Sequence, residues 1–263
     1  MPLIELVYDC HRDRLGSGLA ARFIPLARDD ETNAWLAHWQ ERPHGWLSTR
    51  LVQVLERFAS TYDVHGLLGA YPMHLLSSRA WSELLGGTRA RTLLDVGAGA
   101  GYVTEGARAW FDEIVCTETS RPLLRRLEAR GLTARAIDLT DQPLDGRFDV
   151  VSCFNVLDRT ARPRALARAL VAALHEGGRL LLSIPLPLSP HVHVAGGTVA
   201  QSERLPAVAG GWESAARALS ERLIAPLGLT IDRLARVPYL SRGDAHAPLY
   251  VLDAALWVCS RVS

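Results

Sequence analysis

The order of apolar and amphipathic segments predicts a doubly wound α/β fold with seven strands, a helical N-terminal cap and a C-terminal antiparallel hairpin. From residue 91 onward, short apolar runs alternate with Arg- and Ala-rich segments of helical periodicity, which is typical of a parallel sheet covered by helices. Two longer strand patterns follow each other closely near the C-terminus. With 263 residues, 48% of them hydrophobic, the chain can bury one substantial core.

Residues 1–85 are predicted to form an N-terminal extension and helical cap, and residues 86–263 the α/β domain, together making one compact unit. Apolar residues recur at helical spacing between residues 33 and 85, and a glycine-containing turn at 66–71 interrupts them. Seven of these side chains are expected to share one face: Trp35, Leu36, Trp39, Trp46, Leu47, Leu51 and Leu55.

The parallel part of the sheet is predicted from five apolar runs, at 92–96, 113–118, 133–138, 148–154 and 178–185. Helices are predicted between these runs, near 103–110, 122–130 and 163–176, and a further helix at 212–226. The last two strands, 229–240 and 250–262, are close enough in sequence to pair antiparallel. Five alternating units and this hairpin make the seven strands.

The composition excludes several classes of function. The formal net charge is +1 and no segment has a dense basic face, so nucleic acid is not expected as a partner. All 29 basic residues are arginine, which excludes a lysine Schiff base and a phosphate-loop lysine. Four scattered cysteines favour buried thiols in a reducing compartment over disulfides or a metal site. We expect a cytoplasmic protein with no membrane-spanning segment.

A glycine-rich turn follows the first predicted strand of the sheet. Asp95 precedes Gly97, Gly99 and Gly101, and glycines at this spacing let the backbone approach a ligand and adopt positive φ. Tyr102 stands where a dinucleotide-binding turn has its third glycine. The Asp95 carboxylate would repel a pyrophosphate, but it suits the cationic amino and sulfonium groups of S-adenosylmethionine. The turn therefore predicts a class I methyltransferase sheet, the alternative being a tight turn without a ligand.

Two further acidic residues are predicted at the carboxyl edge of the same sheet. Glu118 ends the second strand, where a carboxylate can accept hydrogen bonds from both ribose hydroxyls. Asp138 ends the third strand, where it can accept from the amino group of adenine, and Ile137 can pack on the ring. The alternative for both carboxylates is a solvated position at a strand end.

Polar side chains also follow the fourth strand. Asn155 and Asp158 are three residues apart and are predicted to face one cavity beside the methyl group to be transferred. Asp158 could equally be the N-cap of a helix, a role that aspartate often has. The residues of this segment leave both interpretations open.

Segment 152–159 (SCFNVLDR) resembles the DREV family, protein-histidine methyltransferases that modify the N1 (π) nitrogen in His-x-His sequences. Further similarity lies in 92–99, 116–118, 212–213, 237–240, 243–244 and 250–253, so the resemblance covers about residues 46–262. The Asn155-x-x-Asp158-Arg159 block and the segments around Tyr239 and Tyr250 are specific to the family, whereas the glycine turn is shared by the whole class.

The resemblance implies roles for individual residues. It assigns Glu118, Asn155 and Tyr239 to S-adenosylmethionine, and Asn155, Asp158 and Tyr250 to the target imidazole. Without the resemblance, both tyrosines would be assigned to strand packing. The chain departs from the family at Ala254, where a second acidic residue is usual, and at Leu249, where a tyrosine is frequent. These departures touch the substrate side of the site.

The expected function is methyl transfer from S-adenosylmethionine to a histidine of a protein or peptide. Two alternatives remain at this point: a small-molecule N- or O-methyltransferase of the same fold, and a non-catalytic adenosyl-binding protein. His191 and His193 form a His-x-His sequence of their own, in the loop after the fifth strand. Because the sequence contains no evident third ligand, we expect a loop that lines the substrate site rather than a metal site, with self-methylation as a further alternative.

Overall fold

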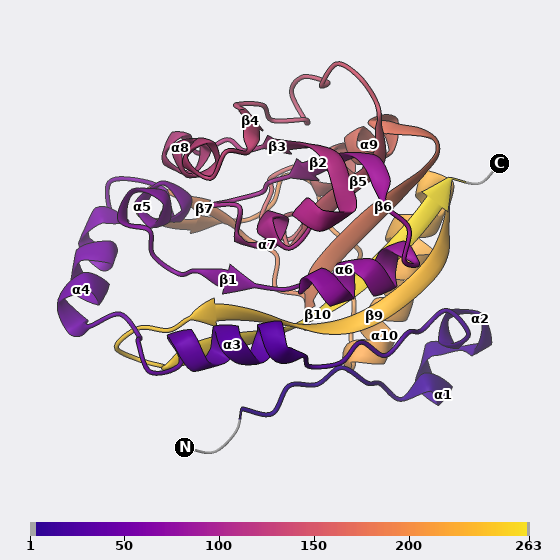
Figure 1. The fold of residues 1–263 in the computed structure, drawn as a ribbon, viewed down its shortest axis with the longest axis horizontal. Coiled ribbons are helices and arrows are strands. Elements are labelled where there is room, and N and C mark those ends of the chain that lie inside the picture. The colour runs from indigo at the N-terminus through magenta and orange to yellow at the C-terminus, as the bar shows by residue number, and fades with distance from the viewer. Residues whose placement is uncertain (1–3, 262–263) are drawn as a thin grey trace.

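The computed structural model describes residues 4–261, and its centre is an eight-stranded sheet. The strand order is β1-β9-β10-β6-β5-β2-β3-β4 (Figure 1). The strands of this sheet are β1 (Met73–His74), β2 (Ala90–Val96), β3 (Phe111–Thr117), β4 (Thr133–Arg135), β5 (Phe148–Phe154), β6 (Leu174–Leu186), β9 (Leu229–Arg242) and β10 (Leu249–Arg261). A separate hairpin joins β7 (Val192–Val194) to β8 (Gly197–Val199).

The seven predicted strands are all present, and their pairing confirms the predicted fold class. Strands β6, β5, β2, β3 and β4 pair in parallel, and β10 pairs antiparallel with both β6 and β9. The eighth strand, β1, pairs antiparallel with β9 through Met73 and Ser241. Two residues are too short a run to show strand periodicity, so β1 could not be predicted from the sequence.

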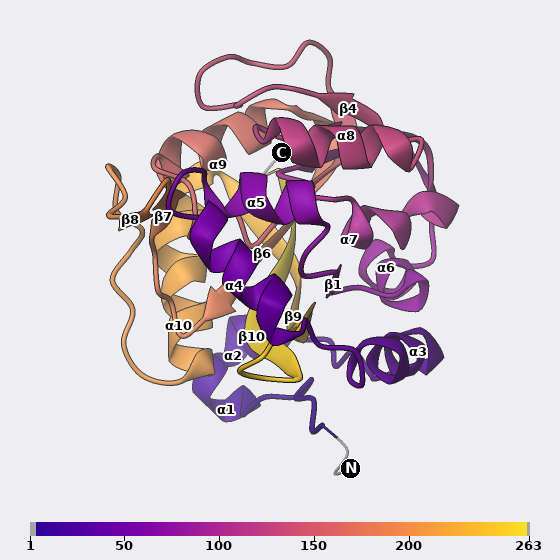
Figure 2. The same ribbon diagram turned by 90° about the vertical axis from the view of Figure 1, so that its left-hand side faces the viewer.

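Helices cover both faces of the large sheet (Figures 1 and 2). They are α1 (Arg12–Leu15), α2 (Ser17–Ala20), α3 (Asp30–Trp39), α4 (Trp46–Leu55), α5 (Thr61–Leu68), α6 (Ser78–Leu85), α7 (Tyr102–Glu105), α8 (Arg121–Ala129), α9 (Pro163–Ala172) and α10 (Trp212–Leu219). Shorter turns extend α7 at Arg108–Trp110 and α10 at Ser220–Ile224 and Ala225–Leu227. The predicted helix at 163–176 ends early because Leu174 already pairs with Phe148 in the sheet.

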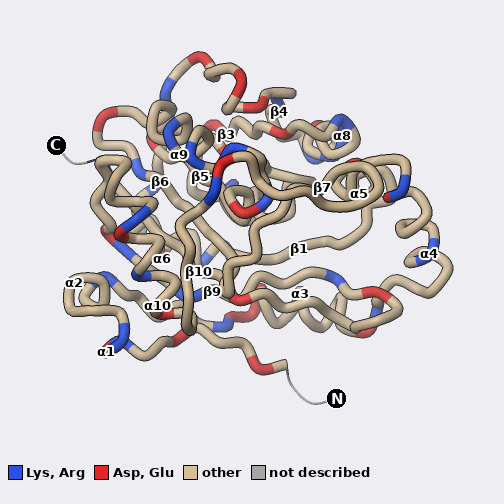
Figure 3. Tube along the Cα trace, turned by 180° about the vertical axis from the view of Figure 1, so that it is seen from behind, with Lys and Arg blue, Asp and Glu red and all other residues tan. Residues whose placement is uncertain are grey.

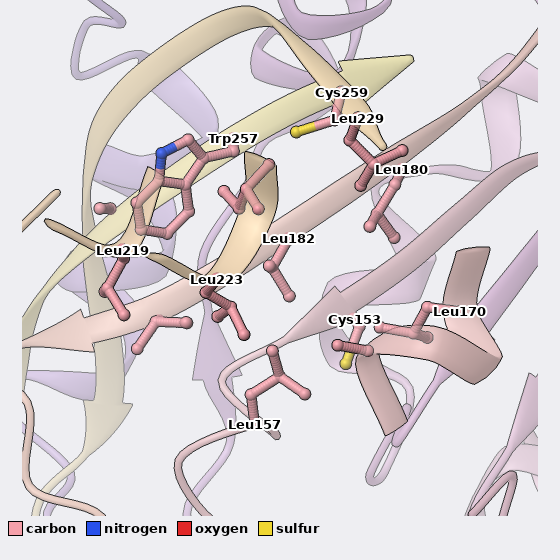
Figure 4. Close-up of a cluster of buried hydrophobic side chains, with 14 of the residues drawn as sticks. Cys153, Leu157, Leu170, Leu180, Leu182, Leu219, Leu223, Leu229, Trp257 and Cys259 are labelled. Atoms are coloured by element: carbon pink, nitrogen blue, oxygen red, sulfur yellow. The ribbon is translucent and has the colours of Figure 1, made fainter. Parts of the chain in front are cut away.

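Successive residues of the central strands point to opposite faces, so the sheet has a core on each side. Leu94, Val151 and Leu182 contribute to one core, which α9 and α10 cover (Figure 4). Leu93 and Val150, their neighbours in sequence, contribute to the other core with Trp81 of α6. Cys116, Cys153 and Cys259 are buried in β3, β5 and β10, and the four cysteines are free, as expected.

The shared apolar face predicted for residues 35–55 is wrong for helix α4. Leu36 is buried, but Trp46, Leu47 and Leu51 are 67%, 66% and 48% exposed. Helix α4 is apolar on several sides and packs through Thr49 and Val52 instead. The chain also turns between Gln40 and Gly45, so α3 and α4 do not form one continuous helical face.

Charged residues of both signs are scattered over the trace seen from behind, most of which is neither basic nor acidic (Figure 3). Among residues 4–261, no helix is long and apolar enough to cross a membrane.

Candidate functional site

The glycine turn lies between β2 and α7 and has the backbone conformation that its sequence predicts. Gly97 and Gly99 have φ values of 70° and 58°, a region that favours glycine. A Cβ atom on Gly97 would lie 2.6 Å from Cγ2 of Val156, so the turn rests directly on the segment after β5. The Gly97 amide donates to the Thr117 carbonyl at 2.9 Å, which ties the turn to the end of β3.

Asp95 lies under this turn and is 3% exposed. Its two carboxylate oxygens accept hydrogen bonds from the hydroxyls of Thr104, at 2.6 Å, and Ser152, at 2.7 Å. Burial raises the pKa of Asp95, and the two hydroxyl donors act against that rise. Asp95 therefore links β2 to α7 and β5, and its negative potential acts on the turn from below.

Glu118 is the first residue after β3 and its carboxylate holds the turn from the side. One oxygen accepts from the Gly99 amide at 3.0 Å, and the other accepts from the amides of Thr119, at 2.7 Å, and Ser120, at 3.0 Å. Burial raises the pKa of Glu118, and the three amide donors oppose that rise. Each carboxylate oxygen can accept more than one hydrogen bond, so this arrangement leaves capacity for ribose hydroxyls.

Asp138 does not end a strand, because β4 ends three residues earlier at Arg135. One of its oxygens accepts from the amide of Thr140, at 2.8 Å, and from the Thr140 hydroxyl, at 2.7 Å. This is a local turn in which an aspartate side chain bonds the backbone two residues on. The second oxygen remains for a ligand. The predicted strand boundary is therefore wrong, while the predicted contact with adenine is not tested.

Asn155 follows β5 and has a positive φ of 57°. Its side-chain oxygen accepts a hydrogen bond from the Ser183 hydroxyl at 2.8 Å, and its backbone N–H donates to the Ser183 backbone carbonyl at 3.0 Å. The side-chain nitrogen Nδ2 is buried and has no hydrogen-bond partner within the described chain. A buried donor without a partner is costly, so Nδ2 marks a position where a ligand atom would bond.

Asp158 lies in the tight turn after β5 and caps no helix, since the N-cap of α9 is Arg162. It is 1% exposed; its Oδ2 pairs with Nε of Arg159 at 3.1 Å, and its Oδ1 has no hydrogen-bond partner among the described residues. Burial raises the pKa of Asp158 to about 6, although Arg159 opposes the rise. The helix-cap alternative is thereby excluded, and a buried carboxylate with a free oxygen remains.

The two predicted tyrosines lie in different surroundings. Tyr239 on β9 contacts the sulfur of Met73 through its hydroxyl, and burial raises its pKa, as do the neighbouring Tyr62 and Asp158. Tyr250 on β10 donates a hydrogen bond of 2.8 Å to Asp244 and is 38% exposed. The structure thus brings Tyr239 close to Asp158, whereas no described contact joins Tyr250 to Asn155 or Asp158.

Three residues of this region were given no role in the sequence analysis, although Asp244 lies in a segment that resembles the family. Asp244 accepts from the hydroxyls of both Tyr71, at 2.9 Å, and Tyr250, at 2.8 Å. The Tyr71 ring also faces His65, with ring centroids 4.5 Å apart. Tyr71, His65 and Asp244 are separated by up to 179 residues in sequence, and no local pattern could have grouped them.

The His191–His193 segment lies beside Asp158, and the prediction that it lines the substrate site stays a prediction. The His191 amide donates to the Asp158 carbonyl at 2.9 Å, and its ring contacts the Arg159 guanidinium. Nε2 of His191 and Nε2 of His193 are 3.2 Å apart. No group of three or more His, Cys, Asp or Glu residues suited to a metal ion occurs in the described part of the chain.

Residues around the turn fit S-adenosylmethionine. The turn presents open backbone at Gly99, where a Cβ would meet no atom within 4 Å, and carboxylates surround it at Asp95 and Glu118. The unpartnered Nδ2 of Asn155 belongs to the segment that Gly97 touches through Val156. Cationic groups, hydroxyls and a carboxylate on one ligand would each find a complementary protein group here.

Part of the chain is similar to curated methyltransferases. Ubiquinone biosynthesis O-methyltransferases of Alkalilimnicola ehrlichii and Bordetella avium are 29% and 25% identical over 39% and 43% of this chain. The matches cover 44% and 51% of those proteins, so the chain spans about half the length of the curated relatives it matches.

Solved structures with a similar fold include two N-methyltransferases. NodS from Bradyrhizobium japonicum, in complex with S-adenosyl-L-homocysteine, has a TM-score of 0.47 at 15% identity, covering 71% of this chain and 85% of NodS. The glycopeptide N-methyltransferase MtfA, with bound S-adenosylmethionine, has a TM-score of 0.46 at 19% identity. The match covers 70% of this chain and 92% of MtfA.

A family model described as DREV methyltransferase matches residues 7–261, nearly the whole chain. The match extends through the N-terminal helices as well as the sheet, and it includes every predicted site residue. The chain therefore belongs to the DREV methyltransferase family, and its methyl donor is S-adenosylmethionine.

Proposed function

We propose that this methyltransferase modifies an imidazole nitrogen, N1 (π), of a histidine in a protein or peptide. The observation that carries the proposal is Asp158, a buried carboxylate whose Oδ1 has no partner, three residues from the unpartnered Nδ2 of Asn155. One group accepts a hydrogen bond and the other donates one. Oδ1 of Asp158 can accept the N–H of a neutral imidazole, which leaves the lone pair of the other nitrogen free to attack, and Nδ2 of Asn155 can donate to an oxygen atom of either ligand.

Methyl transfer requires little from the protein beyond alignment of the attacking nitrogen with the methyl group. When bound, S-adenosylmethionine supplies a methyl group on a sulfonium, which is already a good leaving group. Attack requires an unprotonated imidazole nitrogen, and a histidine with a pKa near 6.5 provides it at neutral pH. The protein must hold this lone pair in line and keep water out.

Asp158 would select which of the two nitrogens attacks. By accepting the N–H of the far nitrogen it fixes the tautomer, as the aspartate of a Ser-His-Asp triad does for its histidine. Its pKa, raised by burial to about 6, is also close to that of an imidazole. The carboxylate can therefore take up the proton that the methylated ring releases and pass it to water. Asn155 and Tyr250 would help to position the ring.

The proposed setting is the reducing cytoplasm, in agreement with the free and mostly buried cysteines. A histidine-containing protein or peptide is the proposed partner. The alternative acceptor is a small molecule with a hydroxyl or amine, because the curated relatives are named as O-methyltransferases.

The test is methylation of a His-x-His peptide with labelled S-adenosylmethionine, followed by digestion and separation of 1-methylhistidine from 3-methylhistidine. We expect the 1-methyl isomer alone, at a rate that rises from pH 6 to 8 as imidazole and Asp158 lose their protons. A catechol and free imidazole serve as competing acceptors. Methylation of the catechol but not of the peptide would overturn the proposal.

Asp158→Ala separates catalysis from binding. Turnover should fall by about a hundredfold or more, while the affinity for S-adenosylhomocysteine stays within a few-fold of the wild type. Asp141→Ala is the matched control, since Asp141 is a mostly exposed carboxylate that pairs with Arg162. Unchanged turnover in Asp158→Ala would remove Asp158 from the mechanism.

A further inference from the structure

Helix α5 is fastened to the end of the sheet where the glycine turn lies (Figure 2). Asp63 accepts a hydrogen bond of 2.7 Å from the hydroxyl of Ser120, two residues after Glu118. Arg126 of α8 donates to the carbonyls of Gly66 and Leu67. A Cβ on Gly66 would lie 2.8 Å from Cβ of Pro122, so α5 and α8 are in close contact. These contacts hold α5 against α8 and against the segment after β3.

Tyr62, next to Asp63 on this helix, faces the candidate site. Its ring meets His193 edge-on, with ring centroids 5.4 Å apart and an interplanar angle of 90°. Burial of the hydroxyl raises the pKa of Tyr62; the Asp158 and Glu118 carboxylates act in the same direction and Arg159 acts against it. The hydroxyl is thus near Asp158, on the acceptor side, and near Glu118, on the cofactor side.

Tyr62 is 37% exposed, and its hydroxyl has no hydrogen-bond partner in the protein among residues 4–261. Other polar atoms at this end of the sheet are buried without a partner, among them Nδ2 of Asn155, Oδ1 of Asp158 and Oγ1 of Thr117. Buried polar groups normally have partners, so each one without a partner calls for an explanation, and a bound ligand is one. Asp158 acts electrostatically on the Tyr62 hydroxyl, so a donor without a protein partner on α5 lies near an acceptor without a partner on the segment after β5.

We propose that Tyr62 is a substrate-binding residue of the methyl-transfer site, and that its hydroxyl donates a hydrogen bond to a carbonyl oxygen of the acceptor peptide. The identity of the acceptor rests on the proposed function. If Asp158 holds the far nitrogen and the near nitrogen attacks, the peptide backbone lies next to the methyl group. A phenolic donor at the cofactor–acceptor boundary is suited to that backbone. Helix α5 is then part of the active site as well as of the N-terminal cap.

The test compares Tyr62→Phe and Tyr62→Ala with the wild type in steady-state kinetics and in calorimetry. Loss of one hydrogen bond in Tyr62→Phe should raise KM for the peptide about five- to tenfold. Tyr62→Ala also removes the wall against His193 and should raise it further and lower kcat. Affinity for S-adenosylhomocysteine should stay within about twofold in both. The control is Tyr8→Phe, at a half-buried tyrosine that packs against the core on the α6 side.

A second variant changes the position of Tyr62 without altering it. Asp63→Asn weakens the link to Ser120 and should raise KM for the peptide in the same direction, with melting temperature near that of the wild type. Peptide binding to protein saturated with S-adenosylhomocysteine gives the same ranking without catalysis.

The outcomes separate the two proposals. If the wild type methylates a catechol and no histidine peptide, the histidine proposal fails, and the catechol KM in Tyr62→Phe then tests Tyr62. If Tyr62→Phe and Tyr62→Ala both keep KM and kcat for the wild-type acceptor within twofold, Tyr62 binds no acceptor. A selective loss of S-adenosylhomocysteine affinity would make it a cofactor residue and would equally overturn the proposal.

Discussion

The two sides of the site differ in how their polar groups are satisfied. On the cofactor side, both oxygens of Asp95 and both oxygens of Glu118 already accept hydrogen bonds from the protein. On the acceptor side, Nδ2 of Asn155, Oδ1 of Asp158 and the Tyr62 hydroxyl have no partner among the described residues.

This difference indicates that the two sides of the site contribute differently to ligand binding. The cofactor side is held in shape by the chain itself, so binding there costs little reorganisation. The acceptor side keeps Nδ2 of Asn155 and Oδ1 of Asp158 buried and unsatisfied at a cost to stability, and a ligand of matching chemistry recovers that cost. Changes on the cofactor side should therefore alter affinity for the methyl donor, and changes on the acceptor side should alter turnover and peptide binding.

The largest effect is expected from Gly97→Ala on the cofactor side. The new Cβ would lie 2.6 Å from Val156 at a φ of 70°, so the turn or the segment after β5 must shift. Affinity for S-adenosylmethionine should fall about a hundredfold, or about 3 kcal/mol in binding free energy. Calorimetry measures this loss. Gly87→Ala is the control, because Gly87 also has a φ of 73° but open space around it. Binding within threefold of the wild type in a folded Gly97→Ala would show that the turn does not carry the cofactor.

An effect of similar size is expected from Asp158→Asn, measured as stability against pH. The Asp158 pKa is raised from 3.8 to about 6 by burial, so the folded protein holds a proton that the unfolded chain loses. The contribution of Asp158 to the free energy of unfolding is therefore fully present below about pH 4. It falls by about 3 kcal/mol as the pH rises to about 6 and above. An asparagine side chain does not titrate, so the variant does not lose stability in this pH range. The variant should melt at a higher temperature than the wild type at pH 7.5, and the difference should shrink towards pH 4. A difference independent of pH would contradict a buried, raised-pKa carboxylate.

The smallest effect is expected from Asp138→Ala. One of its oxygens is engaged by Thr140, and only the other can reach adenine. The loss of a single hydrogen bond corresponds to about a fivefold rise in the dissociation constant of S-adenosylmethionine. Fluorescence or calorimetric titration checks this, with Asp141→Ala as the neighbouring control. An unchanged dissociation constant would mean that Asp138 only stabilises its local turn and does not contact the cofactor.

Sequence reasoning succeeded where function depends on local geometry. Asp95, Gly97, Gly99 and Glu118 meet because parallel strands bring their carboxyl ends to one edge of a sheet, and strand order follows from alternating βα units. Asn155 and Asp158 were found in the same way, as residues that follow a strand. Short apolar runs predicted the buried strands, since the strands of a parallel sheet are covered on both faces.

The sequence-based prediction was wrong where the burial of a side chain depends on residues distant in sequence. Trp46 and Trp81 both lie in apolar helical segments, yet Trp81 is fully buried and Trp46 is 67% exposed. Helix α6 packs on the sheet, whereas α4 contacts α5 through its Thr49 and Val52 side and turns its tryptophan outward. Helix α6 is amphipathic and buries its apolar face, whereas α4 is apolar on several sides, so its sequence does not determine which side is buried.

The sequence by itself determined the sheet, the glycine turn and the carboxylates at the strand ends, because these depend on periodicity and on residues within a few positions of each other. Only the tertiary structure decided that Tyr62 approaches Asp158, that Tyr250 pairs with Asp244, and that Asp158 keeps a free oxygen. These relations join residues up to 96 positions apart in sequence, from Tyr62 to Asp158. Their existence depends on how helices and loops pack over the sheet, and no pattern along the chain records that packing.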